Sequence, residues 1–264
     1  MTSTSNPALK RIRKLRSRKH REDEGAFFVE GIQTVWQAVR NGAEIESIVI
    51  APDLLKSDRA SRMVLTQERQ GTRVLRVGPQ AFSAISEREN PSGLGAVVRA
   101  AAPTLDHLVA APDSLFVALD RPEKPGNVGS IIRAVDAAGG SGVIVIGDSA
   151  DAYHPTAVKA SMGTLFNVPV CTAGAVEDVL SWARARRLAM VTTSARGETL
   201  LWDATYELPA LLLFGSEGSG LAPDVLARGD SSVRIPMRGS ATSLNLAVAV
   251  GVVLYEVRRQ LGRR

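Results

Sequence analysis

Three short blocks of the sequence carry side chains that could position and activate a substrate. They span residues 119–133, 213–221 and 235–246. Asn127 and Arg133 lie in the first block, Glu217 in the second, and Ser243 and Asn245 in the third. Amide, hydroxyl and carboxylate groups orient a reacting hydroxyl by hydrogen bonds, and a guanidinium binds anions. No histidine or cysteine lies in the blocks. Any one block alone would be weak evidence of function.

The first block has a structural and a functional interpretation. Asn127 could simply cap a helix that starts near Val128. Arg133 lies among apolar residues of that helix, where a lone cation is costly unless it has an anionic partner or lies in a cleft. A structural salt bridge would meet that need as well as a substrate would.

The other two blocks also leave alternatives. Residues 215–220 form a glycine-rich turn that allows a ligand to approach the backbone closely. The turn lacks the ending of a phosphate loop and the full dinucleotide fingerprint, so ATP and NAD have little support. Glu217 could cap the next helix, and Ser243 could be the N-cap of a helix that starts at Leu244, with Asn245 in its first turn.

Continuous apolar runs predict the sheet that positions these blocks. They are Leu115–Leu119, Gly142–Ile146, Ala189–Thr193 and Leu211–Phe214. Such runs are typical of parallel strands buried on both faces. Helix-like stretches alternate with them, at Val128–Ala138, Thr156–Ser161, Ala175–Arg187 and Leu244–Gln260. We therefore expect a doubly wound α/β sheet over residues 113–264, with each block just after a strand. Residues 1–100 read as a smaller α/β/α domain, and residues 101–112 as a linker.

Composition restricts the class of protein. The chain has 264 residues, 45% of them hydrophobic, with one cysteine (Cys171) and three scattered histidines. This pattern predicts neither a disulfide framework nor a metal site, and it fits a reducing cytoplasm. No apolar run reaches the roughly 20 residues that span a bilayer, so we expect no membrane association. The three tryptophans are isolated in sequence and predict no base-stacking platform.

Positive charge is concentrated near the start of the chain. Residues 1–100 hold 17 Lys and Arg against 11 Asp and Glu. Eight cations lie within twelve residues: Lys10, Arg11, Arg13, Lys14, Arg16, Arg18, Lys19 and Arg21. This density could neutralise a phosphate backbone, which favours RNA binding. A solvated helix face and a targeting segment are the alternatives.

In order and spacing, the three blocks resemble the motifs of the SPOUT class of methyltransferases, in its SpoU (TrmH-like) branch. The Ser-Leu-Asn triplet at 243–245 after Ile-Pro-Met at 235–237 is the most specific signature. The resemblance implies transfer of a methyl group from S-adenosylmethionine to a ribose 2′-hydroxyl of RNA. It also implies a deep trefoil knot in the Rossmann-like sheet, an L30e-like first domain that binds RNA, and a homodimer. The chain looks closest to the branch members that methylate 23S rRNA, including the avilamycin-resistance type, so ribosomal RNA is favoured over transfer RNA.

The resemblance also assigns roles to residues. Those expected at the reacting groups are Asn127, Arg133, Glu217, Ser243 and Asn245. Those expected at the cofactor are Thr193, Ser194, Phe214, Gly215, Gly218, Ile235, Met237 and Leu244. Lys159, on a stretch that opens with His154, joins the basic opening as an RNA contact, while His154 itself reads as a helix-start residue. Whether Arg133 is the base or binds the phosphate that acts as base stays open, because a guanidinium does not readily give up its proton.

Two rival functions remain at this point. A transfer RNA methyltransferase would carry the same motifs, and a catalytically silent RNA-binding protein of ribosome assembly would keep the same fold. A nucleotide-dependent oxidoreductase is disfavoured because Gly-x-Gly-x-x-Gly is missing after Leu119.

Overall fold

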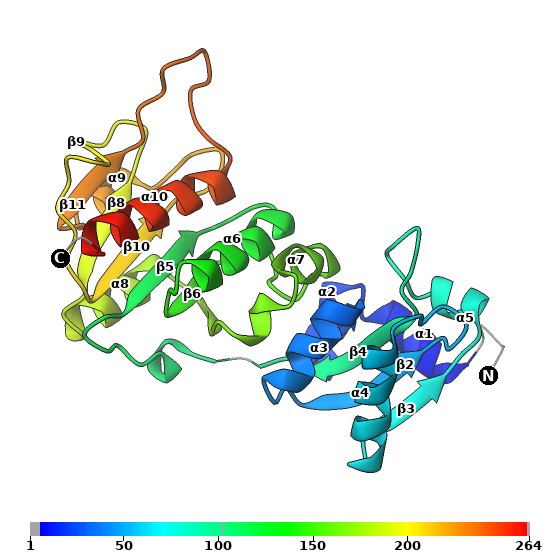
Figure 1. The fold of residues 1–264 in the computed structure, drawn as a ribbon. Helices are drawn as coiled ribbons and strands as arrows, with labels where there is room; N and C mark the ends of the chain where they lie inside the picture. The colour runs from blue at the N-terminus through cyan, green and yellow to red at the C-terminus, as the bar shows by residue number, and fades with distance from the viewer. Residues whose placement is uncertain (1–5, 102, 263–264) are drawn as a thin grey trace. The chain divides into compact units, whose positions relative to one another are not determined.

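The computed structural model describes residues 6–101 and 103–262. Contacts divide them into two compact units. The first holds residues 6–101 together with Tyr153–Asn167, and the second holds residues 103–152 and 168–262. Figure 1 labels the elements of both.

A four-stranded sheet in the order β1-β4-β2-β3 forms the first unit. Its strands are β1 (Ala26–Glu30), β2 (Ile45–Ile50), β3 (Arg73–Arg76) and β4 (Leu94–Arg99). Strand β4 is antiparallel to both neighbours, whereas β2 and β3 are parallel. The helices are α1 (Pro7–Lys14), α2 (Arg18–Glu24), α3 (Ile32–Arg40), α4 (Asp58–Arg69) and α5 (Pro79–Ser83). Helix α4 begins at Asp58 because the Ser57 hydroxyl caps it by accepting from the Ala60 N–H.

Helix α1 contributes to the core of this unit. Leu9, Ile12 and Leu15 recur at a spacing of three residues, and each is 2% exposed or less. They pack with Phe82 and Ile85 in one apolar cluster. The basic opening is therefore an amphipathic part of the fold, with its apolar side inward.

The first unit also includes a segment from later in the chain. Residues 153–167 carry α7 (Pro155–Ser161) and the short 3₁₀ helix η2 (Thr164–Phe166). The Tyr153 ring lies 4.6 Å from the Phe27 ring, centroid to centroid, and the Tyr153 hydroxyl donates to the Ala101 carbonyl. Gly163 lies so close to α3 that a Cβ there would be 2.9 Å from the Cβ of Gln37. The first compact unit is therefore discontinuous in sequence.

A seven-stranded parallel sheet in the order β7-β6-β5-β10-β8-β11-β9 forms the second unit. Its strands are β5 (Leu115–Asp120), β6 (Gly142–Ile146), β7 (Val170–Ala173), β8 (Ala189–Thr193), β9 (Thr199–Leu200), β10 (Ala210–Phe214) and β11 (Ser231–Arg234). Its helices are α6 (Pro125–Ala137), α8 (Val176–Ala185), α9 (Pro223–Leu226) and α10 (Leu246–Leu261), with the 3₁₀ helix η1 (Leu105–His107) before β5. Every residue of β5, β6 and β10 is buried, which explains the continuous apolar runs. The predicted mixed α/β architecture with a parallel sheet is confirmed.

Strand order brings the three blocks to one edge of this sheet. Because β5, β10, β8 and β11 are neighbours and parallel, the loops that leave their carboxyl ends meet there. Open α/β sheets bind ligands at that edge. Helices α6 and α10, which follow the first and third blocks, pack side by side (Figure 1).

Membrane-spanning helices and metal-binding clusters are both absent from residues 6–101 and 103–262. None of their helices combines the length and apolarity that crossing a bilayer requires. Among the same residues, no group of three or more His, Cys, Asp or Glu is arranged to hold a metal ion. Burial raises the pKa of the Cys171 thiol to about 11, which keeps it protonated at neutral pH.

Candidate active site

Side chains from the three blocks form one hydrogen-bonded chain at the carboxyl edge of the second sheet. The Asn127 Nδ2 donates to the Glu217 Oε1 at 2.8 Å. The Asn245 Nδ2 donates to the Asn127 Oδ1 at 3.0 Å. The Asn127 amide thus links Glu217 to Asn245, which lies 118 positions after Asn127 in the sequence. We refer to Glu217, Asn127 and Asn245 as the polar relay.

The first loop holds the carboxylate of the polar relay in place. The Glu217 Oε2 accepts from the backbone N–H of Glu123 at 2.9 Å. Partial burial raises the pKa of Glu217. Hydrogen bonds from the Glu123 N–H and the Asn127 side chain lower it by more, so the net pKa lies below its ordinary value. Glu217 is therefore an ionised acceptor at neutral pH and a weak base.

Asn127 does not cap helix α6, so that expectation was wrong. The helix begins at Pro125, with Lys124 as the N-cap residue. Proline suits this first position because its φ is fixed near the helical value and no N–H is lost. Asn127 is consequently the third helical residue, and its side chain is free to join the polar relay. It is 9% exposed.

Asn245, rather than Ser243, caps the last helix. Its Oδ1 accepts from the backbone N–H groups of Ala247 and Val248 at 3.0 and 3.4 Å. Helix α10 therefore starts at Leu246, two residues later than expected. Asn245 uses its oxygen for the cap and its nitrogen for the polar relay, which fixes the orientation of the amide. Ser243 lies exposed in the preceding loop.

Arg133 is not in the apolar setting that the sequence suggested. It lies on the exposed side of α6 and has no ion pair within the described residues. Six residues at about 100° each place it roughly 240° around the helix from Asn127. Arg133 stays hydrated, because its apolar neighbours face the core and Arg133 does not, so the predicted need for an anionic partner was wrong. The guanidinium is available to a ligand, and it is not part of the polar relay.

The glycine turn is built from tightly opposed backbone. A Cβ at Gly215 would lie 2.0 Å from the carbonyl carbon of Gly220, and Ser216 forms an isolated β-bridge with Gly220. Only glycine fits at 215, directly after the buried Phe214. Gly218 is exposed at the tip of the turn.

The other residues expected at the cofactor border the same edge. Thr193 donates its hydroxyl to the Leu213 carbonyl, and the Ser194 hydroxyl accepts from the Arg196 N–H. Ile235 and Met237 are partly buried, and the Leu244 side chain is 37% exposed. Exposed apolar surface beside backbone polar groups suits a nucleoside, so these residues fit an adenosine-containing cofactor.

One contribution to the polar relay was missed in the sequence. The loop after β5 supplies backbone N–H groups, and it is shaped by a left-handed Arg121 with φ of 50°. Arg121 also pairs with the buried Asp120 at 3.2 Å. Prolines at 122 and 125 were a visible signal of a rigid loop, but backbone direction is not readable from residue types.

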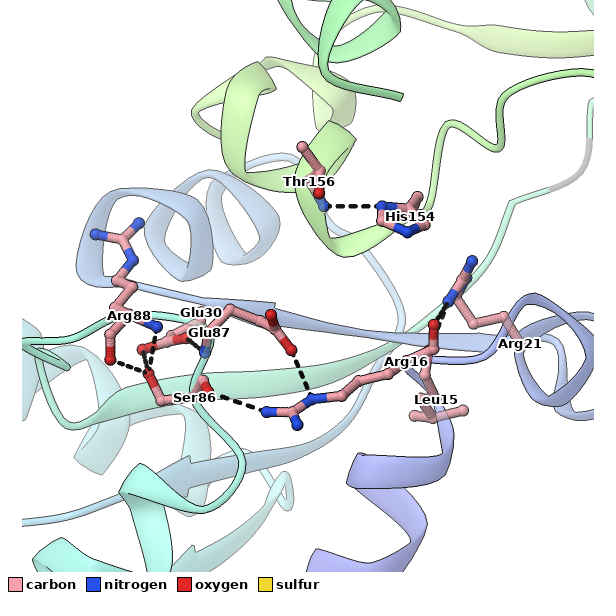
Figure 2. A network of polar contacts seen from close by, with 9 residues as sticks. All are labelled: Leu15, Arg16, Arg21, Glu30, Ser86, Glu87, Arg88, His154 and Thr156. Atoms are coloured by element: carbon pink, nitrogen blue, oxygen red, sulfur yellow. Dashed lines mark hydrogen bonds and ion pairs between the residues drawn. The ribbon is translucent and has the colours of Figure 1, made fainter. Parts of the chain in front are cut away.

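The basic opening is divided between structural and free cations. Arg21 is buried and donates to the carbonyl oxygens of Leu15 and Arg16 at 2.8 and 2.6 Å (Figure 2). Three further arginines form ion pairs, Arg11 with Glu24 and Glu46, Arg16 with Glu87, and Arg18 with Glu22. The lysines Lys10, Lys14 and Lys19 are exposed, without an ion pair in the described part of the chain. The high charge density therefore serves partly to fold the first unit.

The stretch from His154 to Lys159 is placed in the first unit. The His154 Nδ1 accepts from the Thr156 N–H at 3.1 Å, so the predicted helix-start role is confirmed (Figure 2). Lys159 is exposed on α7 and forms no ion pair with any described residue.

Fold and site together define an α/β ligand-binding domain of the Rossmann-like type, preceded by a smaller α/β domain. Residues 114–255 match the SpoU rRNA Methylase family, and residues 6–96 match the MRM3-like substrate binding domain. The chain belongs to the SpoU rRNA methylase family. The resemblance predicted from the three blocks is confirmed.

Curated relatives and solved structures are similar to this chain over nearly its whole length. The 23S rRNA (uridine(2479)-2′-O)-methyltransferase of Streptomyces viridochromogenes is 36% identical over 93% of this chain and 87% of its own. The AdoMet-bound rRNA methyltransferase from Sinorhizobium meliloti has a TM-score of 0.90 and 35% identity, covering 99% of this chain and 97% of that one. The SpoU methyltransferase AviRb from Streptomyces viridochromogenes, in complex with AdoMet, has a TM-score of 0.86 and 33% identity, covering 97% and 98%.

Proposed function

We propose that this chain is an S-adenosylmethionine-dependent methyltransferase that modifies a ribose 2′-hydroxyl of 23S rRNA. The polar relay carries the proposal, because it joins one side chain from each of the three blocks at the ligand-binding edge of the sheet. The named activity of the relative that is 36% identical and the cofactor held by the two similar structures support the same reaction.

The chain's residues have separate roles in this reaction. When bound, S-adenosylmethionine supplies an electrophilic methyl group on a sulfonium sulfur. The residues of this chain would orient the ribose 2′-oxygen towards that methyl group. Glu217 accepts a hydrogen bond from the substrate, and Asn127 and Asn245 fix its position. Alignment is their contribution, because both Glu217 carboxylate oxygens already accept hydrogen bonds, from the Glu123 N–H and the Asn127 amide.

The hydroxyl proton needs a separate acceptor. A guanidinium stays protonated at neutral pH, so we assign Arg133 to binding an RNA phosphate whose oxygen takes the proton. Its exposure and its lack of an ion pair among described residues support this role. Ser243, exposed in the loop before Asn245, is assigned to the substrate side of the site.

The backbone around Gly215 and Gly218, with Thr193, Ser194 and Phe214, is proposed to hold the adenosine and its ribose. Ile235, Met237 and Leu244 would bound the adenine. The tight turn at Gly215 and the exposed apolar side chain of Leu244 support this assignment. We also retain the expected trefoil knot, formed by the second and third blocks.

RNA binding is assigned to the first domain. We propose residues 1–100 as the RNA-binding domain, 101–112 as a linker and 113–264 as the catalytic domain, in line with the two family matches. Lys10, Lys14, Lys19 and Lys159 are the best supported contacts, since each is exposed without an ion pair among described residues. Arg11, Arg13, Arg16 and Arg18 remain proposed contacts, although Arg11, Arg16 and Arg18 also form ion pairs. The proposed ribosomal RNA substrate supports a cytoplasmic location.

A homodimer is proposed from the surface of α10. Val248, Val252 and Tyr255 are 51%, 39% and 56% exposed, and their spacing puts them on one face of the helix. Three large apolar side chains on one exposed helix face indicate an interaction surface. A second copy of the chain would cover it.

Incubation of purified protein with tritiated S-adenosylmethionine and unmodified 23S, 16S or transfer RNA tests the reaction. The labelled nucleotide is then mapped by primer extension sensitive to 2′-O-methylation. Label in 23S rRNA alone is the expected result. Label in transfer RNA alone would make transfer RNA the substrate in place of 23S rRNA. Cofactor binding without methyl transfer to any RNA or to ribosomal particles would indicate the catalytically silent RNA-binding protein.

A further inference from the structure

A hollow of about 140 Å³ lies on the first unit between helices α3 and α4. Its lining consists of Ile32, Gln33, Trp36, Gln37, Arg40, Ser57, Arg59 and Ala60. No part of the polar relay or of the basic opening contributes to it.

An arginine lies on a tryptophan in this hollow. The guanidinium carbon of Arg59 is 4.0 Å from the centroid of the Trp36 ring. At this distance the cation is attracted to the aromatic ring, which holds the planar guanidinium in place. The two residues come from different helices, Trp36 from α3 and Arg59 from α4.

The hollow lacks acidic groups. Two arginines and two glutamines line it, and none of its eight residues is an aspartate or glutamate. Neither Arg40 nor Arg59 forms an ion pair with any described residue. Asp58 precedes Arg59 but does not line the hollow. The arginines of the basic opening differ in this respect, since Arg11 and Arg16 are neutralised by glutamates.

We infer that this hollow binds an unpaired nucleotide of the RNA substrate. Proteins recognise unpaired RNA by stacking its bases on aromatic rings and arginine planes. Arg59, fixed on Trp36, presents such a plane. Arg40 supplies charge for a phosphate, and the amides of Gln33 and Gln37 can both donate to and accept from a base edge. The inference rests on the proposed function in that the ligand is the substrate RNA.

Binding of 23S rRNA to the full-length protein tests the inference. We compare Arg59→Ala, Arg59→Lys and Arg40→Ala with the control Arg69→Ala, which removes an exposed arginine in the last turn of the same helix α4. Loss of the stacked plane should weaken binding about tenfold. Each alanine variant at the hollow should also reduce the slope of log affinity against log salt by about 1. Arg59→Lys should bind nearly as weakly as Arg59→Ala, since lysine keeps the charge but lacks the plane.

The outcomes separate this inference from the proposed reaction. Affinities of the Arg59 variants within twofold of Arg69→Ala would overturn the nucleotide site, even if the wild type transfers methyl groups. Full RNA binding by Arg59→Lys would show that the hollow recognises negative charge alone, as a site for an acidic peptide would. That result would also overturn the nucleotide site. Adenosine monophosphate is tested in parallel, and loss of its binding without loss of RNA binding would identify a site for free nucleotides instead. Weakened RNA binding in the variants, with no transfer by the wild type, would support the site and overturn only the reaction.

Discussion

The Asn127 side chain donates a hydrogen bond to the Glu217 carboxylate from ninety positions earlier in the chain. The contact ties the start of α6 to the glycine turn after β10. Because its Oδ1 accepts from Asn245 as well, the Asn127 amide has one orientation that satisfies both neighbours. A side chain held in this way can position a third group without the entropic cost of ordering itself.

Replacement of Asn127 by alanine should therefore reduce kcat by about 10²–10³, the usual cost of losing one positioned hydrogen-bond donor. Binding of RNA should persist, because the first unit is unchanged. Steady-state methyl transfer measures the former, and filter binding of 23S rRNA the latter. The control is Ser130→Ala, at an exposed position on the same helix. Equal kcat values for the two variants would remove the polar relay from the mechanism.

The lowered pKa of Glu217 predicts how its contribution to stability depends on pH. Its pKa in the folded state lies below the unfolded value of about 4.5, so the ionised form stabilises the fold. The contribution is full above about pH 5.5 and is lost as the pH falls through the folded pKa. Glu217→Gln should thus lower Tm at pH 7 and have a smaller effect at pH 3.5. The exposed Glu207→Gln is the control, and a Tm difference that does not depend on pH would contradict the prediction.

Much of the second unit could be predicted because its strands are buried on both faces. Apolar runs such as Leu115–Leu119 and Leu211–Phe214 mark strands whatever their neighbours are. The three blocks could also be assigned, because their residue types and order are specific. The predicted helix starts were less accurate, because the first residue of a helix depends on which nearby side chain accepts hydrogen bonds from the free backbone N–H groups. Asn245 performs this role in place of Ser243.

Pairing across long sequence distances could not be predicted. Arg11 is neutralised by Glu46, 35 residues away, and Arg59 lies on Trp36 from a different helix. Whether an arginine is free to bind RNA depends on such partners, which only the packed structure shows. The same applies to Arg133, because the side of α6 that faces the core is set by tertiary packing.

Arg133→Lys should abolish turnover while S-adenosylmethionine binding is retained. Lysine keeps the charge, but it lacks the planar fork that holds a phosphate by two hydrogen bonds. Since the position is exposed, the free energy of unfolding should change by no more than about 0.5 kcal/mol. Single-turnover transfer, calorimetric cofactor titration and thermal melting measure the three quantities. Near-normal turnover would refute the role of Arg133.

Gly215→Ala should prevent cofactor binding and lower stability. The added Cβ would lie 2.0 Å from the Gly220 carbonyl carbon, and that contact is backbone, which cannot move aside without opening the turn. The matched control is Gly174→Ala, where a Cβ would meet nothing within 4 Å. Melting temperature and calorimetric titration of S-adenosylmethionine measure both effects. If Gly215→Ala binds the cofactor as well as Gly174→Ala does, the turn is not part of the cofactor site.

Val252→Asp should convert the proposed homodimer into a monomer. An unpaired carboxylate in the centre of an apolar interface loses its hydration without gaining a partner. Light scattering coupled to size exclusion gives the mass in solution, to be compared with the 28.1 kDa of one chain. Val109→Asp is the control, because Val109 is 80% exposed and lies far from α10 in sequence. A wild-type mass of one chain, or a dimer that survives Val252→Asp, would show that the exposed face of α10 is not the dimer interface.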